Sequence, residues 1–129
     1  MNIISDTNIY LAVVLNEPEK ERIIQQTSNC TLHSPEILPY EIGNALSAIV
    51  KRKQLTQSEA MQAIELAQAI PVRLMQVDIN KALELALKFN IYAYDAYFLQ
   101  CALSLNCPLL SLDKKMNDVA KQLNIAVLE

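Results

Sequence analysis

Short apolar runs alternate with helical patterns along the whole chain, and this alternation restricts the fold more than any other feature. Runs with the length and composition of buried strands fall at residues 2–5, 30–33, 72–77, 108–112 and 125–128. Helical patterns cover residues 7–16, 18–27, 39–52, 56–69, 78–89, 94–105 and 114–123. Strands that alternate with helices form a parallel sheet with helices packed on its faces. We therefore expect an α/β fold in which residues 1–129 form a single domain.

Local signals set several helix boundaries. Thr56 and Glu59 have the spacing of a capping box at the start of a helix. Asp78 is expected to cap the following helix rather than to belong to a site. The only glycine, Gly43, lies inside the helix predicted over residues 39–52, where it costs about 1 kcal/mol relative to alanine. We expect it there because another backbone approaches closely.

The scarcity of two residue types excludes several kinds of site. With one histidine, His33, and one glycine, the chain has neither a histidine-rich metal site nor a glycine-rich phosphate loop. It also lacks the Gly-x-Ser-x-Gly turn of a serine hydrolase. Its formal net charge of −3 argues against holding nucleic acid by phosphate neutralisation alone. A metal, a local basic patch or a second subunit would have to supply positive charge.

The composition favours a cytosolic protein without a membrane segment. No apolar run approaches the roughly 20 residues that a membrane span needs. The N-terminal residues lack the basic start and long apolar stretch of a signal peptide. The three cysteines, Cys30, Cys101 and Cys107, form no C-x-x-C pair and are expected to be reduced.

Four carboxylates occupy positions that the expected fold would bring together. Asp6 and Asp113 directly follow predicted strands, and the other two, Glu41 and Asp95, lie near the starts of predicted helices. In an open parallel sheet the ligand site lies beyond the carboxyl ends of the strands. Oxygen ligands without histidine or thiolate suit Mg²⁺ or Mn²⁺, which can polarise a phosphoryl group and activate water. The four form a candidate metal site, although each alone has an ordinary role as a cap or a solvated residue.

The four acidic segments, in this order, resemble the PIN domain, and more narrowly the VapC toxins of prokaryotic toxin–antitoxin pairs. The matching segments are residues 4–8 (ISDTN), 39–46 (PYEIGNAL), 94–99 (YDAYFL) and 108–113 (PLLSLD). The similarity extends over essentially the full chain. One departure is Ser111, where threonine is more usual, but the hydroxyl is retained.

The resemblance implies a Mg²⁺- or Mn²⁺-dependent ribonuclease that is commonly a homodimer and is inhibited by a cognate antitoxin protein. It implies that the four carboxylates are both the catalytic and the metal-binding residues. Four polar residues are expected to support them: Asn8, Asn44, Ser111 and Asn117. Asn44 would orient Glu41, and Asn117 would hold a metal-bound water. The helices near residues 9–15 and 42–50 are expected to carry more apolar surface than one face of the sheet can bury. We expect this surface to form a homodimer interface and a groove for an antitoxin helix.

Two other functions share parts of this pattern. Small-molecule phosphohydrolases of the haloacid-dehalogenase kind also have an aspartate after the first strand, but they require a second aspartate at the position where this chain has Asn8. A non-catalytic PIN-like interaction domain would keep the acidic residues for binding. Tyr92, Tyr94 and Tyr97 bracket Asp95 and are expected to pack in the core or an interface, with stacking on an RNA base as the alternative.

Overall fold

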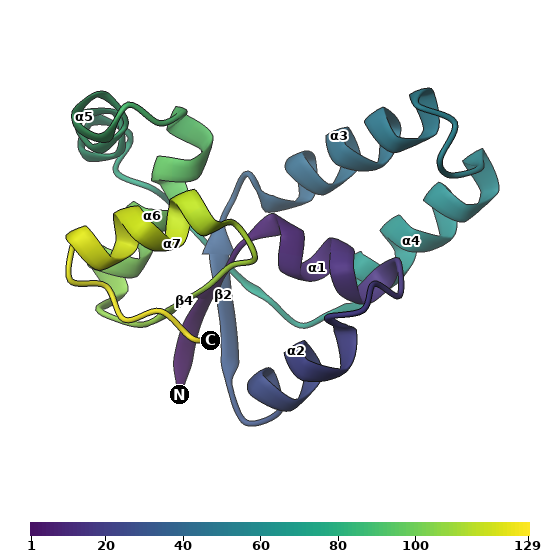
Figure 1. Ribbon diagram of the computed structural model, residues 1–129, viewed down its shortest axis with the longest axis horizontal. Coiled ribbons are helices and arrows are strands. Elements are labelled where there is room, and N and C mark those ends of the chain that lie inside the picture. Colours follow the sequence, from purple (N-terminus) through teal and green to yellow (C-terminus); the bar gives the residue numbers. More distant parts are fainter.

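A four-stranded parallel sheet forms the centre of the protein in the computed structural model, which describes residues 1–129 (Figure 1). The strands are β1 (Asn2–Ser5), β2 (Thr31–Pro35), β3 (Arg73–Met75) and β4 (Leu109–Leu110), in the order β3-β2-β1-β4. The helices are α1 (Thr7–Val14), α2 (Lys20–Thr27), α3 (Leu38–Lys51), α4 (Gln57–Ala69), α5 (Ile79–Phe89), α6 (Ala93–Leu105) and α7 (Lys114–Gln122). All three strand pairs are parallel, which confirms the expected α/β fold.

The helices cover the two faces of the sheet in chain order. Helices α1 to α4 lie on the right of the sheet in Figure 1, and α5 to α7 lie on the left. Right-handed crossovers produce this division, because the chain first moves from β1 through β2 to β3 and then returns to β4 on the other side of β1. The direction of progression therefore reverses between the neighbouring strands β1 and β4. Such a reversal opens the crevice in which parallel sheets commonly bind ligands.

Helix α6 is the central helix, as its apolar sequence predicts. Its buried residues are Ala96, Phe98, Leu99, Gln100, Cys101 and Ala102. The helix contacts β1, β2, α5 and α7. Because α6 packs against the core on several sides, the residues of its first turn are held in fixed positions.

Helix caps follow the expected signals. Thr56 and Glu59 make both bonds of the capping box, and Asp78 accepts a hydrogen bond from the Lys81 N–H at 3.1 Å. Two helices end at asparagines in the left-handed conformation, Asn90 (φ 54°) and Asn106 (φ 50°). In a chain with one glycine, asparagine supplies this conformation because its short polar side chain tolerates it best.

Two expectations about local structure are wrong. The final strand predicted over 125–128 is reduced to one bridge between Leu109 and Val127, because β4 has only two residues with which it can pair. The explanation for Gly43 also fails, since a Cβ atom there would meet no atom within 4 Å apart from its chain neighbours and the backbone of its own helix. No close backbone approach requires glycine at this position.

The most exposed aliphatic row lies on α5 rather than on the segments expected to carry surplus apolar surface, where Leu11, Leu15 and Ile49 are only half-buried. Ile9, Tyr10, Ala12 and Val14 are buried in α1, and Ile42 and Leu46 are buried in α3. Exposed aliphatic residues instead form a row along α5, with exposed fractions of 62% for Ile79, 49% for Leu83 and 75% for Leu87. We call this row the α5 stripe. None of the helices is both long and apolar enough to cross a membrane.

Candidate active site

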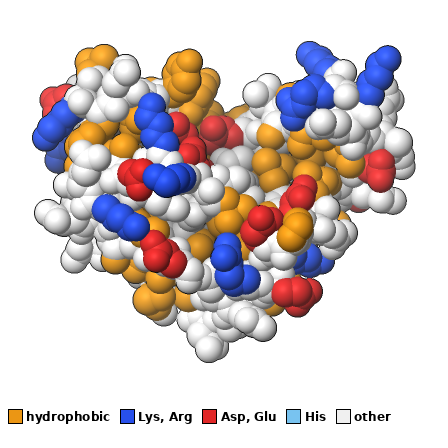
Figure 2. All heavy atoms as spheres, viewed as in Figure 1, with side chains coloured by type: hydrophobic (Ala, Val, Ile, Leu, Met, Phe, Trp, Pro, Cys, Tyr) orange, Lys and Arg blue, Asp and Glu red, His pale blue; other side chains and the backbone are white.

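The four predicted acidic residues lie at the carboxyl edge of the sheet. Asp6 follows β1 and caps α1, while Asp113 follows β4 after two residues and caps α7. Glu41 and Asp95 lie in the first turns of α3 and α6. In Figure 2 acidic side chains gather at a notch between the α3 side of the molecule and the side formed by α5 to α7. The crevice at the chain reversal is therefore strongly acidic.

Asp6 is the most firmly held of the four. Ser111 Oγ donates a hydrogen bond to Asp6 Oδ2 at 2.7 Å, and Asn8 Nδ2 donates to the same oxygen at 3.1 Å. The Thr7 N–H donates to Oδ1 at 2.8 Å. Asn8 also accepts a bond from the Leu112 N–H at 3.1 Å. Two of the predicted supporting residues, Asn8 and Ser111, thus join the ends of β1 and β4 around this carboxylate.

Glu41 is oriented by a residue that the sequence did not single out. Thr7 Oγ1 donates a hydrogen bond to Glu41 Oε1 at 3.0 Å, across 34 residues of chain. Asn44 was expected to orient Glu41. It lines the same hollow of about 290 Å³, but the side-chain hydrogen bond to Glu41 comes from Thr7. The only sequence signal for Thr7 was a hydroxyl residue next to Asp6 in the first acidic segment.

Burial and mutual repulsion alter the acidity of two of these groups strongly. The pKa of Asp6 is raised to about 6, chiefly by burial and to a smaller extent by repulsion from Asp95 and Asp113, against the lowering effect of its hydrogen bonds. The pKa of Glu41 is raised to about 7, chiefly by burial, against the lowering effect of the hydrogen bond from Thr7 and with smaller contributions from the charges of Asp6 and Asp95. Both groups therefore hold a proton at higher pH than an ordinary carboxyl group does, and a bound cation would favour their ionised forms.

Asp95 and Asp113 complete the cluster. Burial raises the pKa of Asp95, repulsion from Asp113 raises it further, and the charge of Lys115 lowers it. None of the four carboxylates forms an ion pair: the two salt bridges of the protein, Lys114–Asp118 and Lys121–Glu129, lie elsewhere. The acidic cluster thus carries more negative charge than its neighbours neutralise.

Asp113 and Asn117 brace the end of β4. Asp113 Oδ1 accepts hydrogen bonds from the Lys115 N–H at 2.9 Å and the Met116 N–H at 3.4 Å, which leaves Oδ2 outside the cap. Asn117 Nδ2 donates to the Ser111 carbonyl oxygen at 3.0 Å. The Oδ1 atom of Asn117 is buried without a hydrogen-bond partner. Asn117 therefore has an unused acceptor next to the strand end that carries Ser111.

The donor chemistry of the cluster fits a hard divalent cation. Its ligand atoms would all be carboxylate oxygens, without histidine or thiolate. In this conformation no three acidic, histidine or cysteine side chains lie close enough to hold one ion between them. Mg²⁺ commonly keeps several waters and uses only one or two carboxylates together with substrate phosphates. The arrangement fits such a hydrated ion better than an ion enclosed by protein ligands.

Comparison with known sequences gives two informative relatives. Ribonuclease VapC9 of Mycobacterium tuberculosis is 26% identical over 120 residues, which cover 92% of this chain and 91% of that protein. Ribonuclease VapC3 of Pyrobaculum aerophilum is 26% identical over 121 residues, covering 90% of this chain and 92% of that protein. Both alignments therefore span nearly the whole of each chain.

Solved structures share the fold. PAE2754 from Pyrobaculum aerophilum superposes with a TM-score of 0.74 at 16% identity, covering 98% of this chain and 83% of that one. VapBC2 from Rickettsia felis, bound to a DNA fragment from the promoter, superposes with a TM-score of 0.70 at 14% identity, covering 99% of this chain and 98% of that one. VapBC-1 from nontypeable Haemophilus influenzae superposes with a TM-score of 0.66 at 22% identity, covering 100% of this chain and 98% of that one.

The family model for the PIN domain matches residues 3–122, a span that contains all four acidic residues and every strand residue except Asn2. The match extends over far more than half of the 129 residues. The chain belongs to the PIN domain family.

Proposed function

We propose that this protein is a metal-dependent endoribonuclease and the toxin component of a type II toxin–antitoxin pair, acting on RNA in the cytoplasm. The observation that carries the proposal is the un-neutralised cluster of four carboxylates at the reversal between β1 and β4. Two full-length relatives named as ribonucleases support the activity. Two structural neighbours described as VapBC structures support an antitoxin protein as the partner.

In this proposal Asp6, Glu41, Asp95 and Asp113 would hold a hydrated Mg²⁺ or Mn²⁺ between them, directly or through its waters. When bound, the ion would polarise the phosphoryl group and lower the pKa of the attacking water. Ser111 and Asn8 fix Asp6, so this carboxylate needs little reorganisation. Glu41 keeps one oxygen outside its bond to Thr7, and this oxygen would be free to face the ion or one of its waters.

The proposal predicts that RNA cleavage depends on added metal. Protein freed of metal with a chelator should leave a labelled RNA intact, and excess Mg²⁺ or Mn²⁺ should restore cleavage, because the acidic cluster alone repels the phosphate. Gel electrophoresis of the products measures both. Cleavage that persists unchanged in excess chelator would contradict the metal site.

The same preparation separates the two alternatives. An interaction domain would bind metal but cleave no RNA. A phosphohydrolase of the haloacid-dehalogenase kind would hydrolyse small phosphate esters and form an acyl phosphate on Asp6. The structure does not favour this last activity, because Asn8 occupies the position of that class's second aspartate and is engaged in hydrogen bonds to Asp6 and the Leu112 N–H.

A homodimer is the second part of the proposal, and we assign its interface to the α5 stripe. Leu83→Asp should shift the protein towards monomer, because it places a charge within a row of exposed aliphatic residues. Sedimentation at tens of micromolar measures the change. Met61→Asp is the matched control, since Met61 is 62% exposed on α4 and lies outside the stripe. A parent protein that is strictly monomeric at this concentration would contradict the dimer.

A further inference from the structure

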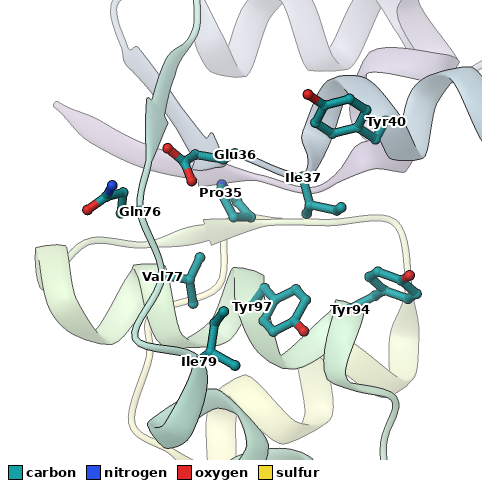
Figure 3. A pocket seen from close by; sticks show the side chains of 9 residues that line it. All are labelled: Pro35, Glu36, Ile37, Tyr40, Gln76, Val77, Ile79, Tyr94 and Tyr97. Atoms are coloured by element: carbon teal, nitrogen blue, oxygen red, sulfur yellow. The ribbon is translucent and has the colours of Figure 1, made fainter.

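A pocket of about 600 Å³ lies beside the acidic cluster, and the proposed chemistry leaves it without a role. Its walls come from the end of β2, the start of α3, the segment after β3, and the starts of α5 and α6 (Figure 3). Most of its lining is apolar or aromatic. Its volume lies within the roughly 300–1,000 Å³ that small-molecule sites occupy.

The pocket adjoins the hollow that contains Glu41. Ile37, Tyr40 and Tyr94 line both spaces. Tyr40 directly precedes Glu41, and Tyr94 directly precedes Asp95. Each tyrosine therefore stands at the boundary between a carboxylate of the cluster and the pocket. A substrate whose phosphate lay at the cluster would have a neighbouring group within reach of the pocket.

The aromatic residues at this boundary are exposed and oriented. Tyr40 is 74% exposed and Tyr94 is 55% exposed. The ring of Tyr97 packs edge-to-face against that of Tyr94, with 5.9 Å between centroids and an interplanar angle of 85°. Tyr94 is therefore supported by its own helix and needs little ordering on binding. Bases of single-stranded RNA stack on aromatic side chains of this kind.

Charge decides which part of an RNA can enter. Glu36 lines the pocket, Glu41 lines the adjoining hollow, and Asp95 follows Tyr94 in the sequence, so negative charge on this side of the molecule would repel a phosphate in the pocket. A nucleobase is planar and uncharged, and it suits apolar walls with aromatic rings. The pocket fits the base rather than the backbone.

The far end of the pocket is polar. Glu36 and Gln76 lie there, opposite Tyr40 and Tyr94 (Figure 3). A carboxylate offers two acceptor oxygens and no donor. Guanine presents two adjacent N–H donor groups on its Watson–Crick edge, whereas each of the other three bases presents one donor group beside acceptors. A carboxylate at this position therefore favours guanine.

We infer that this pocket binds a nucleobase flanking the scissile phosphate of single-stranded RNA, with Tyr40 and Tyr94 stacking on the base and Glu36 selecting guanine. The inference rests on the proposed ribonuclease function for its substrate. The two can fail separately, because binding of a single nucleotide needs no cleavage.

The test measures the binding of the four nucleoside 5′-monophosphates by NMR titration of the full chain in the presence of Mg²⁺. GMP should bind about tenfold more tightly than the other three, which is the discrimination of one bidentate base contact. Tyr40→Ala should weaken all four by about tenfold through lost stacking, and Tyr40→Phe should retain binding. Glu36→Gln should weaken GMP alone. Tyr92→Ala is the matched control, because Tyr92 is 83% exposed and lines neither space.

Cleavage kinetics on short RNAs supply the second measurement. Tyr40→Ala should raise KM about tenfold with a smaller change in kcat, since the base contact exists before and during the reaction. Equal affinity for all four nucleotides would overturn the guanine assignment. Unchanged nucleotide affinity and KM in Tyr40→Ala would overturn the base pocket. If this variant also loses self-association or antitoxin binding while nucleotide affinity is unchanged, the pocket serves protein contact instead. A protein that binds GMP here but cleaves no RNA would contradict the proposed function alone.

Discussion

Asp95→Asn should reduce metal-dependent RNA cleavage by about a thousandfold or more. The ion that Asp95 is proposed to hold contributes several kcal/mol of transition-state stabilisation, and each 1.4 kcal/mol corresponds to a factor of ten in rate. The amide keeps the shape of the side chain but loses the charge that would attract the ion. Steady-state cleavage of a labelled RNA measures the effect.

The fold should survive this change. Asp95 lies in the first turn of α6, whose buried residues hold the helix in the core. Loss of its favourable interaction with the helix N-terminus costs about 0.3–1 kcal/mol, and relief of its repulsion from Asp113 offsets this. Asp118→Asn is the matched control, because Asp118 lies on α7 in an exposed ion pair with Lys114. If Asp95→Asn cleaves RNA at the parent rate while the control behaves normally, Asp95 does not belong to the site.

Glu41→Gln should make the metal-free protein more stable at pH 8 and should flatten its dependence on pH. The pKa of Glu41 is raised from 4.5 to about 7 in the folded state, chiefly by burial. The folded protein therefore holds this proton more tightly than the unfolded chain does. The stabilisation is fully present below pH 4.5 and is lost as the pH rises through 7. A neutral amide does not titrate, so parent and variant should differ at pH 8 and converge near pH 4.

We expect a difference of about 1 kcal/mol at pH 8, since Glu41 is only half-buried and solvent screens part of the effect. Metal should reverse the order: Mg²⁺ at a hundred times its dissociation constant adds about 2.7 kcal/mol to the parent, and the variant should gain far less. Thermal melts at several pH values, with chelator and with Mg²⁺, measure both effects. Glu65→Gln, at an exposed position on α4, is the control. A metal-free Glu41→Gln protein that is less stable than the parent at pH 8 would show that the carboxylate is structural.

Asp6 is less suited to this experiment because of its hydrogen bonds. It accepts bonds from Ser111, Asn8 and the Thr7 N–H, and an amide would turn one of its acceptors into a donor facing another donor. Glu41 accepts only one side-chain bond, from Thr7, and glutamine can still accept it through its carbonyl oxygen.

The edge positions of the acidic residues could be predicted because parallel strands end at a common edge. Asp6 and Asp113 follow strands that turned out to be neighbours, which placed them in one crevice. The bond from Thr7 to Glu41 could not be predicted, since it depends on how α1 packs against α3. A sequence pattern specifies which residues share a helix face, but it does not specify the distance between two helices.

Helix α5 shows the same limit on a larger scale. Its small residues Ala82 and Ala86 face the core, and its larger residues Leu83 and Leu87 face outward. Leu85 packs towards the core beside the two alanines. The apolar face of α5 is wider than the core can cover, and the sequence pattern does not specify which part of that face stays exposed.

The pairing of β1 with β4 also determines when the site can form during synthesis. Ser111, which donates the shortest hydrogen bond to Asp6, is added to the growing chain 105 residues after it. At roughly 5–20 residues per second, this delay lasts roughly 5–20 s. Until then a nascent chain has neither the Ser111 hydroxyl nor the Asp113 carboxylate, and β1 has no β4 beside it. The acidic site therefore remains incomplete until residue 113 has been added to the growing chain.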